Sequence, residues 1–197
     1  MQKQKTSHRV RCTWAKIDPT LITYHDTEWG VPVHNDRLLF EMLNLEGAQA
    51  GLNWLTILKK RCSYRHAFDN FDAKKIAVYD SEKRQKLLSD KGIIRNRLKV
   101  NAFIENAKVA LAIRQKYGSL DVYLWNFIDG NKKLTQVHHE EISEISKRMS
   151  KQLKKDGFRF IGQTTCYAFM QAVGMINDHA PKCFRYAELQ KEGKYSE

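Results

Sequence analysis

Apolar residues in this chain recur three or four positions apart, the spacing that places them on one face of an α-helix. The clearest run follows Asn35 and Asp36, a typical helix start, and predicts a helix over residues 36–50 with one face in the core. A second run opens at Trp54 and predicts a helix over residues 53–68. The apolar positions of the first run are Leu38, Leu39, Met42, Leu43 and Leu45.

Helical spacing also covers most of the remaining chain, and no segment shows the alternation of a half-buried strand. The expected fold class is therefore all-α. Residues 131–140 are expected to form a loop, and the polar segment 176–197 to be irregular past Cys183. The other helices are expected over residues 19–29 after Asp18-Pro19, 73–79 after Asp72, 81–89 after Asp80, 95–117, from Ser119 to Asp129-Gly130, 141–155 and 163–175.

One acidic and one indole side chain stand where the first two helices meet. Glu46 ends the apolar run directly before Gly47, and Trp54 opens the next run after Gly51 and Leu52. A carboxylate beside an aromatic ring at the end of an element is typical of binding sites. The pattern also fits a simpler interpretation, in which Glu46 is a capping or surface acid and Trp54 is a core residue.

The chain is strongly basic, with 34 Lys and Arg against 22 Asp and Glu and a formal net charge of +12. The excess is spread along the chain, so the folded surface itself is expected to be basic. Such a surface favours polyanions, nucleic acid first and an acidic membrane second. The charge alone also fits a soluble basic protein with no such partner.

The sequence contains no membrane-spanning or secretory pattern. No run of eighteen apolar residues is present, and the first residues, MQKQKTSHRVR, lack an apolar segment. We therefore expect a cytoplasmic protein with no membrane contact. Its cysteines are then expected to be free thiols or metal ligands, not disulfides.

Residues 155–164, KDGFRFIGQT, predict a tight hairpin between two helices. Gly157 and Gly162 allow sharp turns. The helix that starts near Gln163 and Thr164 offers unpaired N–H groups, which bind phosphate oxygens well. The segment fits a helix–hairpin–helix element that holds a DNA backbone without reading its sequence. An ordinary helix–helix corner, with Phe158 and Phe160 filling the core, fits the pattern equally. The neighbouring cations are Lys151, Lys154, Lys155 and Arg159.

Metal-ligating residues stand near both ends of the chain. Cys12 and His25 lie near the beginning, and His179 and Cys183 lie near the end with a spacing of one helical turn. A Cys2His2 set is typical of a structural zinc site with no open position for water. These four residues can equally be unrelated. Cys62 and Cys166 lie within amphipathic helices and are expected to be buried thiols.

Four segments together resemble a known family: RCTWAKIDPTLITYHDTEWGVP, LFEMLNLEGAQAGLNWLTILKKR, GIIRNRLKVNAFIENA and GFRFIGQTTCYAFMQAVGMINDH. They are similar, in order and spacing from about Arg11 to Cys183, to the 3-methyladenine DNA glycosylase I family. That family belongs to the helix–hairpin–helix glycosylase superfamily. The resemblance implies a single domain over residues 11–185 with two helical lobes and a pocket between them. Residues 1–10 would be a flexible extension and 186–197 a tail.

The resemblance also implies roles for individual residues. Glu46 would be the carboxylate that recognises the base and the main catalytic group, with Tyr24, Trp54 and Trp14 as pocket aromatics. Leu21 and Ala168 depart from the family pattern near the pocket, and no carboxylate occurs in QTTCYAFMQAVG after the hairpin. The DNA-binding residues would be Gly51 and Leu52 as a wedge, with Gly157, Phe158, Arg159, Gly162, Gln163 and Thr164 in the hairpin. Cys12, His25, His179 and Cys183 would hold one structural zinc ion that joins the two ends of the chain.

The implied activity is hydrolysis of the N-glycosidic bond of 3-methyladenine in alkylated double-stranded DNA by a monomer, leaving an abasic site. Two other functions share the basic surface and the hairpin. One is a DNA-binding module without enzymatic activity that senses alkylated or distorted DNA. The other is a structural zinc protein that binds RNA. Neither of these requires Glu46 beside Trp54 in a pocket.

Overall fold

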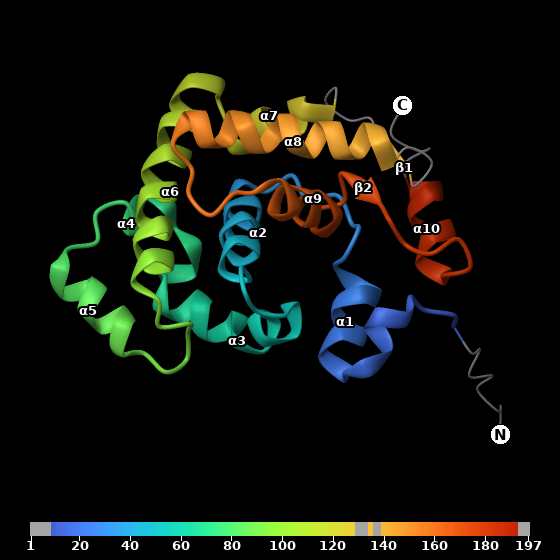
Figure 1. Cartoon of the computed structure of the whole chain (residues 1–197), viewed down its shortest axis with the longest axis horizontal. Helices are drawn as coiled ribbons and strands as arrows, with labels where there is room; N and C mark the ends of the chain where they lie inside the picture. The colour runs from blue at the N-terminus through green and yellow to red at the C-terminus, as the bar shows by residue number, and fades with distance from the viewer. Residues whose placement is uncertain (1–8, 129–133, 136–138, 193–197) are drawn as a thin grey trace.

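The computed structural model describes residues 9–128, 134–135 and 139–192. Within these residues the chain is mostly helical (Figure 1), which confirms the expected all-α class. Short 3-10 turns lie at Thr13–Ile17, Asp69–Phe71 and Asn126–Ile128. The α-helices are α1 (Pro19–Thr27), α2 (Asp36–Ala48), α3 (Trp54–Ala67), α4 (Ala73–Ile76), α5 (Ser81–Ser89), α6 (Arg97–Tyr117), α7 (Leu120–Trp125), α8 (His139–Asp156), α9 (Gln163–Ala172) and α10 (Phe184–Glu192).

Helix starts follow the local sequence closely. Each helix from α1 to α7 begins with a side-chain oxygen that accepts a hydrogen bond from a backbone N–H of the first turn. The expected starts at Asp18-Pro19, Asn35, Asp72, Asp80 and Ser119 are therefore confirmed. Such caps satisfy N–H groups that have no partner inside the helix. Helix α9 differs, since the residue before it, Gly162, has no side chain to cap its first turn.

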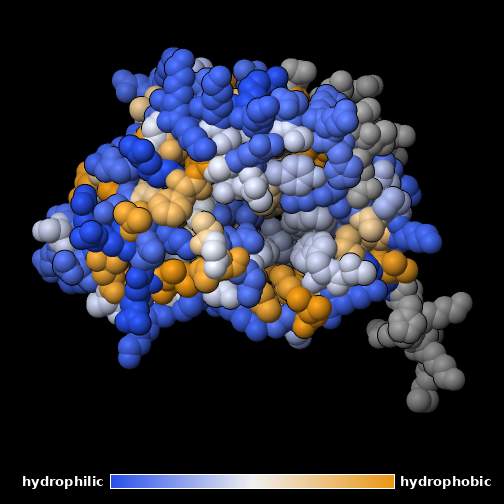
Figure 2. All heavy atoms as spheres, in the orientation of Figure 1, coloured by the Kyte–Doolittle hydropathy of each residue, from blue (hydrophilic) through white to orange (hydrophobic). Residues whose placement is uncertain are grey.

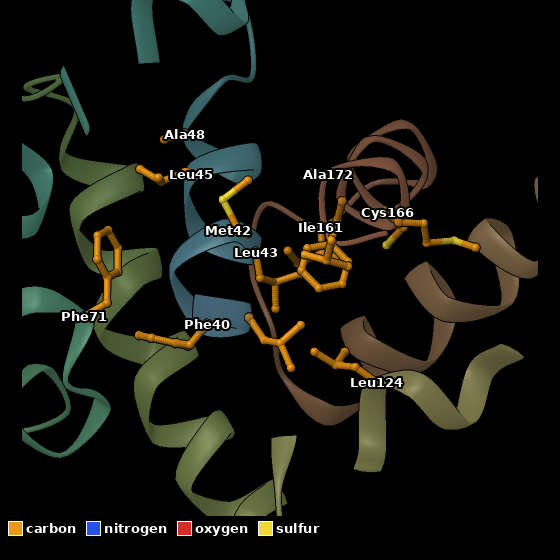
Figure 3. Packing of buried hydrophobic residues seen from close by; sticks show 14 of the residues in the cluster. Phe40, Met42, Leu43, Leu45, Ala48, Phe71, Leu124, Ile161, Cys166 and Ala172 are labelled. Carbon is orange, nitrogen blue, oxygen red and sulfur yellow. The ribbon is translucent and has the colours of Figure 1, made fainter. Parts of the chain in front are cut away.

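Helix α2 lies at the centre of the molecule. Every residue from Leu39 to Ala48 is buried, because α3, α6, α7 and α9 all contact this helix. Figure 3 shows Phe40 on the side of Phe71, and Leu43 near Ile161 on the opposite side. The expectation that only one face of this helix is in the core is therefore wrong, and its polar residues in this stretch are buried as well.

Cys166 is buried as expected, but Cys62 is exposed, because it lies off the buried face of α3.

Two other expectations need correction. The segment past Cys183 is not irregular up to Glu192, because it forms α10, whose Leu189 is buried. The predicted tail 186–197 therefore begins inside a helix, and residues 193–197 lie outside the described residues. Extended pairing was not expected, but residues 134–135 (β1) pair in parallel with 176–177 (β2). Two-residue strands are too short to produce an alternating pattern.

The two ends of the described chain lie together, since α1 and α10 are on the same side of the molecule (Figure 1). The backbone N–H of Phe184 donates to the carbonyl of Val10 at 3.0 Å. Residues 1–8 of the predicted extension, and most of the predicted loop 131–140, lie outside the described residues. Among the described residues, no helix combines the length and the apolar composition that crossing a bilayer requires.

Candidate functional site

A cavity of about 350 Å³ opens where α1, the end of α2, the start of α3 and α9 meet. The face drawn in Figure 2 is hollowed near its centre, in the region of these elements. The cavity offers flat aromatic walls and a few polar groups, which is the usual composition of a small-molecule site. Its lining residues are Trp14, Tyr24, Trp29, Glu46, Gln49, Trp54, Ala168, Gln171 and Asp178.

Aromatic rings from separate segments form one wall of this cavity. Tyr24 lies on α1, and Trp54 is the first residue of α3, which Asn53 caps. The ring centroids of Tyr24 and Trp54 are 5.6 Å apart, and Trp14 lies 6.5 Å from Tyr24. The structure thus brings Trp14, Tyr24 and Trp54 together beside Glu46, as the sequence analysis expects.

Glu46 differs from the other buried polar residues of α2. Glu41 is buried but pairs with Arg61, whose Nε donates to it at 2.5 Å. Asn44 is buried but accepts a hydrogen bond from Asn106 at 3.0 Å. Glu46 is 6% exposed, lines the cavity and has no hydrogen bond or ion pair with any described residue. Since buried polar groups are normally satisfied, this carboxyl group is a candidate ligand-binding group, and its burial rules out a surface or capping acid.

Burial also changes the acidity of this group. It raises the pKa of Glu46 from its usual 4.5 to about 8, because the ionised carboxylate loses water without gaining a partner. A cationic ligand in the cavity would supply that partner. The site therefore favours a flat, positively charged molecule that can stack on the rings and approach the carboxylate.

This pKa has a measurable consequence for stability. The folded protein holds the Glu46 proton more tightly than the unfolded chain does, so its stability falls as the pH rises from about 4.5 to about 8. Above that range the full cost of ionisation, at most about 5 kcal/mol, is present. Glu46→Gln is expected to raise the free energy of unfolding by a few kcal/mol at pH 9 and very little at pH 5. Denaturant unfolding at both pH values measures this. Glu105→Gln, on the exposed side of α6, is the control and is expected to show no such pH dependence. An equal gain in stability at both pH values for Glu46→Gln would contradict the raised pKa of Glu46.

A second cluster ties the two ends of the chain together. The ligand atoms of Cys12, His25, His179 and Cys183 lie within 4.8 Å of one another, and all four residues are buried. His179 Nδ1 lies 3.2 Å from His25 Nε2 and 3.7 Å from Cys12 Sγ, and Cys183 Sγ lies 3.4 Å from His25 Nε2. Tetrahedral ligands at ordinary Zn–S and Zn–N bond lengths leave separations of about 3.3–3.8 Å between one another. The separations in the cluster lie at or close to this range, so the cluster could hold a metal ion, and the four residues are not unrelated in space.

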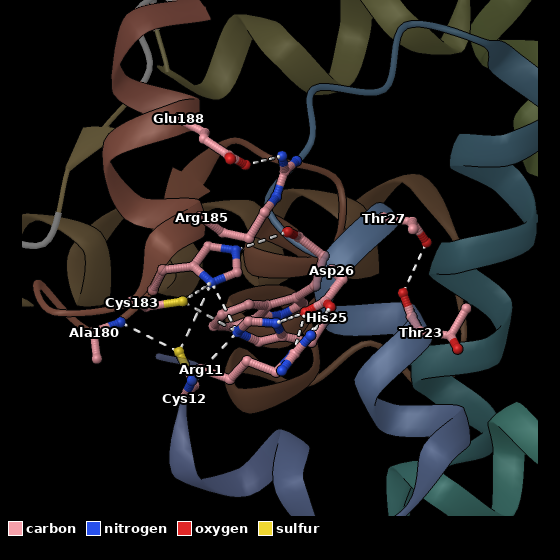
Figure 4. A network of polar contacts seen from close by, with 12 residues as sticks. Arg11, Cys12, Thr23, His25, Asp26, Thr27, Ala180, Cys183, Arg185 and Glu188 are labelled. Atoms are coloured by element: carbon pink, nitrogen blue, oxygen red, sulfur yellow. Dashed lines mark hydrogen bonds and ion pairs between the residues drawn. The ribbon is translucent and has the colours of Figure 1, made fainter. Parts of the chain in front are cut away.

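Neighbouring groups orient the ligands of this cluster (Figure 4). His25 Nδ1 is 2.8 Å from Asp26 Oδ1, and Arg11 holds the same carboxylate. His179 Nε2 is 3.0 Å from the carbonyl of Trp29, so each imidazole has an acceptor on the nitrogen that faces away from the cluster. The backbone N–H of Ala180 donates to Cys12 Sγ at 3.3 Å. Burial lowers the pKa of both histidines, which keeps the imidazoles neutral, the form that binds metals.

Comparison with known proteins identifies the family. Residues 14–186 match the model of the methyladenine glycosylase family. The chain belongs to this family. DNA-3-methyladenine glycosylase 1 of Escherichia coli (strain K12) is 46% identical over 182 residues, which cover 89% of this chain and 96% of that protein. A crystal structure of 3-methyladenine DNA glycosylase I has a TM-score of 0.84 at 46% identity, covering 89% of this chain and 98% of the other. The Staphylococcus aureus enzyme, whose structure concerns 3-methyladenine recognition, gives 0.82 at 34% identity and covers 88% of this chain and 95% of its own.

In this member of the methyladenine glycosylase family, the residues expected to contact DNA fall into two places. Gly51 and Leu52 form the turn between α2 and α3, where Gly51 has a positive φ of 77° and Leu52 is 40% exposed. The hairpin between α8 and α9 carries exposed Arg159, and exposed Gln163 and Thr164 begin α9 directly after it. Phe158 of the same hairpin is buried, and its ring packs in the core and supports the hairpin from inside.

Some lining residues were not expected from the sequence. Gln171 Nε2 donates to Asp178 at 2.5 Å, and both line the cavity together with Gln49 and Trp29. The sequence spacing could have indicated two of these residues. Gln49 follows Glu46 by three positions and Gln171 follows Ala168 by three, so each pair shares a helix face. Of the two departures from the family pattern, Ala168 lines the cavity, whereas Leu21 is a buried core residue outside its lining.

Proposed function

We propose that this protein removes 3-methyladenine from alkylated double-stranded DNA by hydrolysing the N-glycosidic bond, and leaves an abasic site. The observation that carries the proposal is the buried, unpartnered carboxyl group of Glu46 beside the rings of Tyr24 and Trp54. Relatives from Escherichia coli and Haemophilus influenzae, 46% and 44% identical, bear the name of this activity. A solved relative, 34% identical, has 3-methyladenine bound.

The substrate supplies the charge that the cavity lacks. Methylation at N3 makes adenine cationic in DNA, so the electron-poor base stacks well on Trp54 and Tyr24, with a cation–π contribution of about 0.5–2 kcal/mol. Glu46 accepts hydrogen bonds from the amino edge of the base, and ionisation of the carboxyl group strengthens these bonds. Unmodified adenine carries no such charge and remains stacked in its pair, which accounts for selection of the damaged base.

The same positive charge weakens the bond to the sugar. When the base has been flipped into the cavity, a water oxygen bonds to C1′ and the C1′–N9 bond breaks. The electron pair of that bond returns to the base, which leaves as a neutral molecule, so no residue has to protonate it. The water proton goes to solvent. Glu46 acts mainly by recognition and by electrostatic stabilisation of the bound cation.

Two exposed elements hold the DNA. Leu52 fills the gap that the flipped base leaves in the stack, at an unstacking cost of a few kcal/mol. The hairpin between α8 and α9 acts as a helix–hairpin–helix element, in which the uncapped N–H groups at the start of α9 bind backbone phosphate. The cations that support it, Lys151, Lys154, Lys155 and Arg159, are all exposed.

One structural zinc ion on Cys12, His25, His179 and Cys183 completes the proposal. The donor set and its separations support zinc, and four protein ligands leave no position for a reacting water. The ion would join α1 and the segment before it to the segment before α10, and so hold Trp29, beside His179, in the wall of the cavity.

Release of free bases from methylated duplex DNA, separated by chromatography, tests the proposed activity. The expected result is release of 3-methyladenine and formation of alkali-sensitive abasic sites, in proportion to one another. Binding of methylated duplex without any release would favour the DNA-binding module that lacks enzymatic activity. Preference for RNA over duplex DNA in a competition experiment would favour the RNA-binding protein instead.

Replacement of Trp54 tests the stacking contribution separately. Trp54→Ala is expected to weaken binding of free 3-methyladenine about tenfold, because stacking of a base on an aromatic ring contributes roughly 1–3 kcal/mol. Isothermal titration calorimetry with free 3-methyladenine measures this affinity. Trp54→Phe keeps a ring in place and is expected to recover most of the affinity. Unchanged affinity in Trp54→Ala would show that the indole does not stack on the base.

A further inference from the structure

Helix α6 contributes no residue to the cavity lining, yet it contains two buried polar side chains that bind backbone elsewhere. The first is Lys99. Its Nζ donates to the carbonyl oxygens of Ala48 and Ala50, both at 2.8 Å. These carbonyls lie at the end of α2, where backbone oxygens have no partner within the helix and a cation is favourable. Lys99 therefore fixes the start of the turn that carries Gly51 and Leu52.

The second is Asn106, which is 1% exposed. Its Oδ1 accepts a hydrogen bond from the backbone N–H of Arg159 at 2.7 Å, and its Nδ2 donates to the Arg159 carbonyl at 3.3 Å. The same Nδ2 also donates to Asn44 Oδ1 at 3.0 Å. Asn106 therefore binds both backbone groups of one hairpin residue and connects the hairpin to α2.

Close packing supports this connection. Phe160, the next hairpin residue, has a positive φ of 57° and lies against Gly47 of α2. A Cβ atom at Gly47 would lie 3.2 Å from both Cβ and O of Phe160, so only glycine permits this approach without a shift. The hairpin and the end of α2 are thus held together by backbone contact and by Asn106.

Lys99 and Asn106 are seven residues apart on α6, which is two helical turns and about 10.5 Å along the helix axis. They lie on one face, so a single rigid helix holds both the turn and the hairpin. Buried polar side chains are costly unless they are fully hydrogen-bonded, and apolar residues would suffice for packing alone. The hydrogen bonds of these two residues go to the two elements that the proposed function places on DNA.

We propose that Lys99 and Asn106 are positioning residues that set the distance between the Gly51–Leu52 turn and the hairpin between α8 and α9. The inference rests on the proposed function, since it assigns no chemistry to α6 itself. With the spacing fixed, the hairpin grips the backbone while Leu52 enters the stack at the damaged base. Without this fixed spacing, the cavity still binds a free base, but flipping of the damaged base out of paired DNA becomes inefficient.

Lys99→Met tests this proposal, because methionine keeps most of the side-chain volume and removes both hydrogen bonds. Excision from paired duplex under single-turnover conditions is expected to fall about tenfold or more, since misplacement by 1 Å can cost about a hundredfold. Affinity of the folded protein for free 3-methyladenine is expected to stay nearly unchanged, because Lys99 does not line the cavity. The deficit is expected to shrink on single-stranded alkylated DNA, where the base need not be unstacked from a pair.

Lys108→Met on the same helix is the matched control, since Lys108 is exposed and pairs with Glu105 on the surface. Asn106→Ala tests the contact between α6 and the hairpin. It is expected to weaken binding to duplex DNA without changing the affinity for the free base. Equal losses on paired and single-stranded DNA, or a parallel loss of free-base affinity, overturn the proposal. If wild-type protein releases no base, the proposed function fails instead. Wild-type release with undiminished release by Lys99→Met rejects only the positioning role.

Discussion

Glu46→Gln is expected to lower the single-turnover rate of 3-methyladenine release from duplex DNA by about a hundredfold or more, the usual cost of losing one electrostatic group from an active site. Glutamine has nearly the same shape and still accepts a hydrogen bond, but it cannot carry the negative charge that the cationic base requires. Affinity for the duplex is expected to change by only a few-fold, because the proposed DNA contacts lie on the hairpin and the Gly51–Leu52 turn. Equal losses in excision and in DNA affinity would sink the role assigned to Glu46.

Glu41→Gln is the matched control for this result. Glu41 is also a buried acid of α2, but it pairs with Arg61 and Arg65 outside the cavity. Its replacement is expected to lower stability, because the arginines lose their partner, and to leave excision per folded molecule nearly unchanged. The two variants together separate the removal of a buried acid from the removal of the acid that faces the substrate.

The pH profile gives an independent check on Glu46. The value of kcat/KM reports ionisation in the free enzyme, and burial raises the pKa of Glu46 to about 8. Since the ionised form binds the cation, kcat/KM is expected to rise with pH up to about 8 and then to level off. In Glu46→Gln this rise is expected to disappear. A profile that stays the same in the variant assigns the ionisation to another group.

Local patterns predicted the helices well but not their burial. Asn35, Asp72 and Ser119 mark helix starts because a cap depends on neighbours within three residues. The full burial of α2 depends on distant partners: Arg61 neutralises Glu41, and a residue 62 positions away, Asn106, satisfies Asn44. Periodicity carries no information about such pairs, so these positions resembled a polar face in the sequence.

In the candidate site, too, the sequence revealed residues that are close together along the chain and missed those that come from distant segments. Glu46 and Trp54 stood out because they lie close together in the sequence at the junction of two helices. Gln171 and Asp178 come from a distant segment and reach the cavity only because α9 packs beside α2. Helix α10 was missed because few of its residues are apolar, although Leu189 is buried and Phe184 packs against the core.

His179→Ala is expected to remove the metal from purified protein and to lower Tm by about 10 °C or more. Structural zinc sites contribute roughly 10–16 kcal/mol in small zinc-finger peptides, and the loss of only a part of this exceeds a typical core substitution. The effect is expected to be large because the cluster joins residues that are up to 171 positions apart, from Cys12 to Cys183. Elemental analysis of zinc per chain and thermal unfolding with and without chelator measure it.

Cys62→Ser is the control for this variant, since Cys62 is exposed and lies outside the cluster. It is expected to keep one zinc ion per chain and the wild-type Tm. Loss of the ion in His179→Ala is also expected to weaken free-base binding, because Trp29 lines the cavity and its carbonyl is 3.0 Å from His179 Nε2. Full zinc content in His179→Ala would refute the four-ligand site. Zinc loss with unchanged base affinity would show instead that Trp29 and the other aromatic residues keep their positions in the cavity without the metal.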